Sequence, residues 1–257
     1  MFLEDCEIVE NKKIAEDKYI LKVKSKEAFK HIKAGQFFML KSSTYLRRPI
    51  SVHYVSNDMV EFYYQVKGEG TKYLSNLKEK VNIQGPLGNG FDTNINNKKV
   101  LIAAGGMGIA PIKLLIEKLV NNNNNITLVM GAANKDALNI MERFNTYNIS
   151  LHIVTDDGSV GDKCNAVEKT NEIIKKEKFD IIYTCGPTIM MNGIIKIALA
   201  NNILCYASLE RRMACGVNAC LGCNVEVSYD NKTVVLKKAC SDGPVFDAKY
   251  LWIKNEQ

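Results

Sequence analysis

The stretch KKVLIAAGGMGIAPIKLLIEKLV, residues 98–120, contains the pattern that decides the fold. A continuous apolar run leads into a glycine-rich turn, and an amphipathic segment with Pro111 near its first position follows. Such a run is typical of a buried strand, and proline is common in the first turn of a helix. The stretch therefore predicts a strand, a turn and a helix of an α/β protein.

The same order of strand and helix recurs through the middle of the chain. The segments ITLVMGAAN, ISLHIVTDDG and FDIIYTCGP are strand-like, and the segments DALNIMERF, VEKTNEIIKK and TIMMNGIIKIALAN are helical in pattern. This alternation predicts a doubly wound parallel sheet over residues 96–206. The run NNNNN at residues 121–125 breaks a helix, and we expect a surface loop there.

The two ends of the chain have different patterns. In residues 1–95, ISVHYVS and MVEFYYQV flank a short turn, and TKYLSNLKEK predicts one helix with Thr71 near its start. Short strands with turns between them predict a small antiparallel barrel. Residues 207–257 hold a cysteine cluster and the hairpin-like stretch NVEVSYDNKTVVLKKA. We therefore expect three domains, and we expect the last to depend on a bound cofactor for stability.

Composition excludes several classes of function. The 257 residues are 46% hydrophobic and 24% charged, as in an ordinary globular protein. The net charge is +6, but the lysines are scattered and no basic stripe carries aromatic residues, so we expect no nucleic-acid partner. The N-terminus MFLEDCEIVENKK lacks the features of a signal peptide, and no window is apolar enough to span a membrane. We expect a cytoplasmic protein, whose cysteines stay reduced.

Four cysteines near the C-terminus form the most specific motif. Cys215, Cys220, Cys223 and Cys240 begin with the C-x4-C-x2-C spacing of a plant-type [2Fe–2S] cluster. The alternative is a zinc site, but a zinc ribbon has two C-x2-C pairs and only Cys220 and Cys223 form one. The spacing favours the iron–sulfur cluster.

Two motifs in the first domain indicate a flavin nucleotide. In RRPIS, residues 47–51, Arg48 is suited to hold a pyrophosphate, and the hydroxyl of Ser51 is suited to reach a flavin ring. In GEGT, residues 68–71, a glycine loop opens a helix, where free N–H groups favour a phosphate. RRPIS alone is a weak signal, since arginine and proline next to a strand are commonplace, and GEGT alone is equally compatible with an ordinary helix cap.

Two strand-to-helix turns indicate a dinucleotide site. The turn GGMGIAP, residues 105–111, has the right context, although Ala110 stands where a Rossmann motif has its third glycine. The sequence CGP, residues 185–187, predicts a second such turn, and two turns at strand ends favour a ligand crevice more than either does alone. Cys185 is a candidate neighbour of the nicotinamide, or else a packed turn residue.

The histidines form no catalytic arrangement. We interpret His53 and His152 as structural residues of strands, and neither they nor His31 belong to a serine–histidine–acid pattern. Cofactors must therefore carry the chemistry.

The order RRPIS, GEGT, AAGGMGIAPI and CGP resembles the ferredoxin–NAD(P) reductase superfamily, in which a flavin-binding barrel precedes a nicotinamide-binding sheet. The tail LERRMACGVNACLGC…KKACSDGPVF closely resembles one branch, the electron-transfer subunits of class 1B, NAD-linked dihydroorotate dehydrogenases. The resemblance covers essentially the whole chain, and the cysteine segment is its most specific part.

The resemblance implies that residues 1–95 bind FAD, residues 96–206 bind NAD and residues 207–257 hold the cluster. Asn218 stands where the family usually has glycine, but asparagine tolerates a left-handed backbone better than most residues. Ser51 is the candidate catalytic residue, at the reactive edge of the flavin. The implied flavin site comprises Arg48, Pro49, Ile50, Ser51, Tyr63, Tyr64, Gln65, Gly70 and Thr71; the implied dinucleotide site comprises Gly105, Gly106, Gly108, Cys185 and Gly186; the implied metal ligands are Cys215, Cys220, Cys223 and Cys240.

The resemblance also implies a role in de novo pyrimidine biosynthesis. Electrons from the FMN of a dihydroorotate-oxidising partner subunit pass through the [2Fe–2S] cluster and FAD to NAD⁺, the electron acceptor, in a heterotetramer of two chains of each kind. NAD rather than NADP follows mainly from the resemblance, because Lys135 is able to meet a 2′-phosphate.

Two alternatives stay open. One is a reductase subunit of a ferredoxin-linked transhydrogenase or a sulfide dehydrogenase, although those relatives often have aspartate as the first cluster ligand, where this chain has Cys215. The other is a zinc-stabilised, non-redox binding module, which leaves RRPIS and GEGT unexplained.

Overall fold

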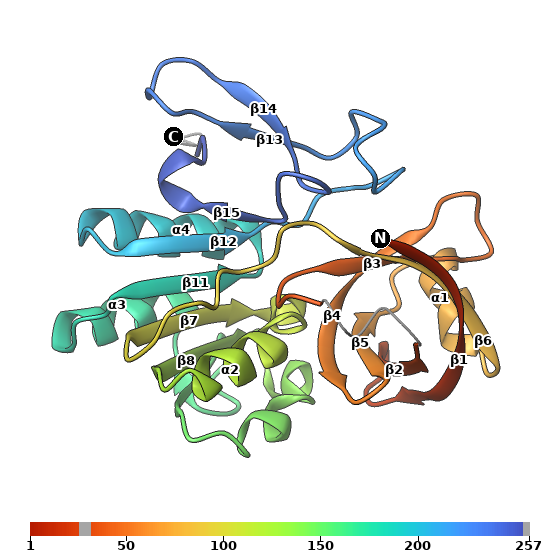
Figure 1. Cartoon of the computed structure of the whole chain (residues 1–257). Coiled ribbons are helices and arrows are strands. Elements are labelled where there is room, and N and C mark those ends of the chain that lie inside the picture. The colour runs from red at the N-terminus through yellow and green to blue at the C-terminus, as the bar shows by residue number, and fades with distance from the viewer. Residues whose placement is uncertain (26–31, 254–257) are drawn as a thin grey trace.

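The N-terminal part of the computed structural model, which describes residues 1–25 and 32–253, is a closed antiparallel barrel. Its strands follow the order β1–β2–β5–β4–β3–β6 (Figure 1). The predicted barrel is confirmed, and His31 lies outside the described residues. The elements are β1 (Phe2–Lys13), β2 (Lys18–Lys24), β3 (Phe37–Leu40), β4 (Arg48–Ser56), β5 (Met59–Gln65), α1 (Glu69–Asn76) and β6 (Lys80–Leu87).

Local turn chemistry explains the hairpin of β4 and β5. Ser56 pairs with Met59, and between them Asn57 has a φ of 49°, a left-handed conformation that asparagine tolerates. Helix α1 follows and contains Thr71, as predicted, but it ends at Asn76 because Lys80 already begins β6.

The middle of the chain forms a sheet of seven strands, in the order β10–β9–β8–β7–β11–β12–β15. The neighbours from β10 to β12 are parallel, which confirms the predicted doubly wound sheet. The last strand comes from the C-terminal segment and runs antiparallel to β12, which the sequence did not predict. The strands are β7 (Lys99–Gly105), β8 (Asn125–Ala132), β9 (Ser150–Thr155), β10 (Asp162–Lys163), β11 (Ile181–Cys185), β12 (Leu204–Ser208) and β15 (Val245–Asp247).

Helices cover both faces of this sheet. The turn η2 (Gly106–Ile109) leads into α2 (Ile112–Asn121), and α3 (Ala166–Lys176) and α4 (Thr188–Ala200) follow later strands. Side chains of β7 alternate between two cores: Ile102 packs in the cluster that contains α2, and Leu101 packs in the cluster that contains α4. Burial on both faces explains the continuous apolar run of this strand. No helix within the described residues is long and apolar enough to cross a membrane.

The expected helix at DALNIMERF is wrong. This segment forms two short 3₁₀ helices, η3 (Lys135–Leu138) and η4 (Met141–Phe144). Asn139 lies between them, and its side chain donates to the carbonyl of Asp136 at 3.0 Å. Such local side-chain bonds compete with the hydrogen bonds of an α-helix.

The asparagine run ends α2 as expected, but it is not a simple surface loop. Asn124 is buried, and its side-chain nitrogen donates to the carbonyls of Ile95 and Leu119, each at 2.9 Å. Its side-chain oxygen accepts from the N–H of Lys98 at 2.9 Å. Asn124 therefore ties the connection before β7 to the end of α2.

The C-terminal segment contains the predicted hairpin, β13 (Asn224–Val227) and β14 (Val235–Lys238), followed by β15 and the short helix η5 (Ala248–Tyr250). Its buried residues Val225 and Phe246 belong to the same cluster as Leu101 of the sheet and Met39 of the barrel. The segment is therefore stabilised by a core that it shares with the other two parts of the chain.

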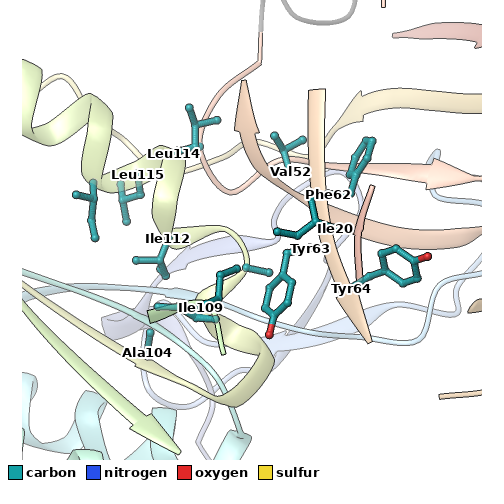
Figure 2. Packing of buried hydrophobic residues seen from close by; sticks show 14 of the residues in the cluster. Ile20, Val52, Phe62, Tyr63, Tyr64, Ala104, Ile109, Ile112, Leu114 and Leu115 are labelled. Atoms are coloured by element: carbon teal, nitrogen blue, oxygen red, sulfur yellow. The ribbon is translucent and has the colours of Figure 1, made fainter. Parts of the chain in front are cut away.

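A second cluster joins the barrel to the sheet. Figure 2 shows Val52 and Tyr63 on barrel strands, with Ile109 and Ile112 of the glycine turn and α2 on the other side. All four side chains are at most 3% exposed. The contact is thus a continuous apolar core and not a flexible hinge.

Replacing Asn124 with Ala should lower the free energy of unfolding by about 1–3 kcal/mol, because buried backbone groups of residues 95, 98 and 119 lose a partner. Chemical denaturation measures this change. The matched control is Asn121→Ala, since Asn121 is exposed at the end of α2 and should tolerate the change. Equal stability of the two variants would contradict the role given to Asn124.

Candidate functional site

The flavin motifs meet at one corner of the barrel. Arg48 begins β4 and Gly70 lies in the first turn of α1. A Cβ atom at Gly70 would stand 2.1 Å from Nε of Arg48, so only glycine allows the guanidinium group to lie on the start of this helix. Arg48 also donates from Nη2 to the Thr44 hydroxyl at 2.7 Å. A fixed cation and free helix N–H groups together form a corner suited to a pyrophosphate.

Thr71 shapes this corner from within. Its hydroxyl accepts from the N–H groups of Lys67, at 2.9 Å, and Gly68, at 3.3 Å, and donates to the carbonyl of Gly68 at 3.1 Å. The side chain therefore caps the helix. These bonds hold the glycine loop in place.

Ser51 lies farther along the same strand. It pairs with Phe37 of β3, and Pro49 pairs with Met39. Pro49, Ile50 and Ser51 are half-buried, and the Ser51 hydroxyl has no hydrogen-bond partner among the residues that the structure describes. This hydroxyl is available to a ligand that lies along β4.

The side chains of Tyr63, Tyr64 and Gln65 have other partners. The Tyr63 hydroxyl donates to Oδ1 of Asn139, at 3.0 Å, across the contact with the sheet. Tyr64 donates to Oδ1 of Asn11 at 3.2 Å, and Gln65 donates to Asp17. Because these polar groups already have partners, a ligand along β5 would meet the backbone and the shape of the strand.

The two glycine turns of the sheet lie against each other. A Cβ atom at Gly108 would stand 2.2 Å from the carbonyl oxygen of Cys185 and 2.5 Å from the nitrogen of Gly186. Strands β7 and β11 are adjacent, with β8 and β9 on one side and β12 on the other. The strand order thus reverses here, which is where open α/β sheets bind nucleotides. The structure thus places Gly105 and Gly108 against Cys185 and Gly186, whereas Gly106 lies in the same turn with open space beside it.

Cys185 is not a reactive thiolate in this setting. Burial raises the pKa of its thiol to about 12, and the hydrogen bond with Ser208 opposes that rise only in part. The thiol is therefore neutral at pH 7. It provides a small, polarisable wall at the end of β11.

The four C-terminal cysteines form two pairs. The Cys220 thiol hydrogen-bonds Cys215, and the backbone N–H of Cys220 donates to Sγ of Cys215 at 3.3 Å. The side chains of Cys223 and Cys240 are also hydrogen-bonded to each other, without a backbone bond between them, and the charge of Cys215 raises the pKa of Cys240. Within the described part of the chain, no three Cys, His, Asp or Glu side chains surround a position for a single metal ion.

Backbone N–H groups point at these sulfur atoms. Burial raises the pKa of Cys215, but hydrogen bonds from the N–H of Val217 and from Cys220 outweigh it and lower the pKa to about 7. Burial and the Cys223 thiol raise the pKa of Cys240 to about 11, against a hydrogen bond from the N–H of Asn218. Asn218 has a φ of 67°, a left-handed conformation that asparagine tolerates better than most residues.

Residues 215–223, which we call the cysteine loop, pack against the barrel. A Cβ atom at Gly216 would stand 2.7 Å from Cγ of Met39, and Met39 pairs in β3 with Pro49 of β4. Only one strand, β3, therefore separates the cysteine loop from the strand that carries Arg48 and Ser51. Figure 1 shows the loop between the β13–β14 hairpin and β3.

Sequence reasoning missed the residue that anchors this segment. The Asn89 side chain donates to the carbonyls of Asp242, at 2.9 Å, and Val245, at 2.8 Å, and accepts from the N–H of Val245 at 3.2 Å. No local signal identifies it, because its partners lie in a distant part of the chain.

Two parts of the chain match known protein families. Residues 210–251 match the iron-sulfur cluster binding domain of dihydroorotate dehydrogenase B, and residues 101–196 match the oxidoreductase NAD-binding domain. The two matches cover the cysteine loop and the paired glycine turns.

Solved structures support the fold. A chain from the NADH-dependent reduced ferredoxin-NADP oxidoreductase superposes with a TM-score of 0.84 at 32% identity, covering 96% of this chain and 89% of the other. The ferredoxin reductase of carbazole 1,9a-dioxygenase gives a TM-score of 0.68 over 79% of this chain and 66% of the other; at 15% identity it supports the fold alone.

Relatives of known sequence extend over nearly the whole length. The dihydroorotate dehydrogenase B (NAD(+)), electron transfer subunit of Caldanaerobacter subterraneus subsp. tengcongensis is 37% identical over 94% of this chain and 95% of its own. The subunit of the same name from Clostridium acetobutylicum is 34% identical over 93% of both chains. This chain therefore belongs to the family of electron transfer subunits of dihydroorotate dehydrogenase B, and it is an oxidoreductase subunit.

Proposed function

We propose that this chain transfers electrons between the FMN of a dihydroorotate-oxidising partner and NAD⁺, in de novo pyrimidine biosynthesis in the cytoplasm. The main support for the proposal is that the flavin corner, the dinucleotide turn and the cysteine loop are adjacent in one packed structure. The cysteine loop packs through Met39 on β3, β3 pairs with β4 of the flavin corner, and β4 contacts α2 of the dinucleotide turn. When bound, FAD exchanges one or two electrons and an iron–sulfur cluster exchanges one at a time.

The barrel residues fit FAD. Arg48 and the N–H groups at the start of α1 would hold its pyrophosphate, and Gly70 is needed so that both reach the same phosphates. Ser51 would orient the reactive edge of the flavin ring through its unpartnered hydroxyl. Residues 1–95 would thus form the FAD-binding domain, residues 96–206 the NAD-binding domain and residues 207–257 the cluster domain.

The pairing of the cysteines supports a [2Fe–2S] cluster. Such a cluster needs four thiolates shared between two iron atoms, whereas a structural zinc ion needs four ligands around one point. Cys215 with Cys220 and Cys223 with Cys240 make two pairs. N–H groups of the loop that already point at sulfur would stabilise the deprotonated ligands.

The exposed apolar residues at the rim of the cysteine loop are suited to contact with a protein partner. Leu221 is 73% exposed and Val217 is 39% exposed, and both lie between cluster ligands. Apolar residues at the edge of a redox centre exclude water when a partner docks. The partner would be the FMN-containing catalytic subunit, in a heterotetramer with two chains of each kind.

A second function is favoured by one observation. The chain is 32% identical to a chain of the NADH-dependent reduced ferredoxin-NADP oxidoreductase, so a transhydrogenase subunit with a ferredoxin-linked partner is the alternative. Cys215 at the first ligand position favours the dihydroorotate branch. Co-purification from the native source, followed by assays of NAD⁺ reduction with dihydroorotate and with reduced ferredoxin, separates the two.

Protein purified without oxygen should contain about two iron and about two labile sulfide per chain, together with FAD. Metal analysis, sulfide determination and the visible spectrum measure these contents. Zinc without sulfide would overturn the redox function and support a zinc-stabilised binding module.

Replacing Arg48 with Ala should weaken FAD binding by roughly 10- to 100-fold, because a charge-assisted phosphate contact is lost. FAD content after gel filtration at low protein concentration measures the change, and iron content should stay the same. Arg47→Ala is the matched control, because Arg47 instead donates to Asn82 Oδ1 at 2.5 Å. If Arg48→Ala keeps its FAD as well as Arg47→Ala does, the flavin corner is misplaced.

Replacing Cys223 with Ser should lower dihydroorotate-driven NAD⁺ reduction in the reconstituted complex by more than about tenfold, since serine is a poorer iron ligand than thiolate. NADH-dependent reduction of a soluble dye should largely survive, because FAD and NAD bind elsewhere. Cys164→Ser is the control, since Cys164 lies outside the cysteine loop. Complex formation must be verified by gel filtration. A variant that binds its partner without a cluster and still couples at the native rate would make the cluster structural.

A further inference from the structure

His53 lies at an irregularity of the flavin-binding strand. Val52 of β4 pairs with Phe62 of β5, but Tyr54 already pairs with Glu61, so His53 is the extra residue of a β-bulge. A bulge redirects a side chain and is frequent next to active sites. His53 follows Ser51 by two positions and is fully buried.

The ring of His53 reaches the dinucleotide turn. Its Nδ1 lies 2.7 Å from the carbonyl oxygen of Ala110, which follows the turn η2 and is separated from α2 by Pro111. A carbonyl only accepts, so Nδ1 carries the proton and donates. This hydrogen bond joins the strand of the flavin corner to the turn of Gly105–Gly108, and Tyr63 supports it from the side with a ring centroid distance of 5.7 Å.

The opposite nitrogen faces charged groups. Nε2 has no hydrogen-bond partner within the described residues, and it lies 3.7 Å from Oε1 of Glu61. Arg143 binds both oxygens of Glu61, and Lys113 lies on the Tyr54 ring, 3.2 Å from its centroid. Burial lowers the pKa of His53 to about 4, although Glu61 opposes this, so the ring is neutral at pH 7. Its contribution there is one directed donor, Nδ1–H.

We propose that His53 is a positioning residue: its hydrogen bond to Ala110 sets the separation and angle between the flavin strand and the dinucleotide turn. This inference rests on the proposed function. A flavin and a nicotinamide react only when their rings are stacked closely, and small displacements of bound groups cost large factors in rate. The buried bond joins the strand that carries Ser51 to the residue that follows the glycine turn, so it links the two proposed nucleotide sites.

Two amide substitutions test the position of the donor. Asn places its side-chain N–H where Nδ1 stands, and Gln moves it outward to the place of Nε2. With His53→Gln, kcat of NADH-dependent dye reduction should fall about ten- to hundredfold, and KM for NADH should rise. His53→Asn should retain most of the native rate. The long-wavelength charge-transfer absorbance of a nicotinamide stacked on a flavin should be lost with Gln and kept with Asn.

Folding and flavin content are measured in parallel. FAD content and melting temperature should be similar for the two amide variants, which excludes a general loss of structure. The inference is overturned if both variants match the native protein, or if both lose activity and absorbance equally. A native protein that holds no FAD would instead refute the proposed function, so the two failures are distinguishable.

Discussion

The backbone of the glycine turn lies so close to the end of β11 that no side chain fits between them. Any residue other than glycine at position 108 would place its Cβ atom 2.2 Å from the carbonyl oxygen of Cys185. This steric constraint fixes the position of the turn, which lies where the strand order of the sheet reverses. Helix α2 begins directly after the turn and packs on β4, so the position of the barrel, and with it of Arg48 and Ser51, depends on the same contact.

The C-terminal segment depends on the barrel and the sheet for its stability. The cysteine segment contributes a small hairpin and an edge strand, too little to bury a core alone. It gains stability from the shared core, from the bonds of Asn89 and from the packing of Gly216 on Met39. These contacts hold the cysteine loop beside the barrel.

Buried polar groups decide how the barrel and the sheet are oriented. Glu61 is 5% exposed and is paired with Arg143 across the contact, and His53 bonds Ala110. Buried charges cost desolvation energy, so their contribution to stability is small, but each directed bond is satisfied in only one arrangement. An apolar contact between Tyr63 and Ile109 alone would tolerate sliding. These polar bonds therefore restrict how the barrel is oriented on the sheet.

The sequence alone determined the barrel, the parallel sheet and the set of four cysteines, because apolar runs, turn residues and ligand spacing are local properties. Only the tertiary structure decided that β15 joins the sheet, that Asn124 is buried, and that residues 135–144 form 3₁₀ turns instead of a helix. The same holds for the burial of His53 and its hydrogen bond to Ala110, because from sequence it is one histidine in a strand. In each case the outcome depends on a residue distant in the chain or on a single side-chain hydrogen bond. The periodicity of the sequence contains no information about either.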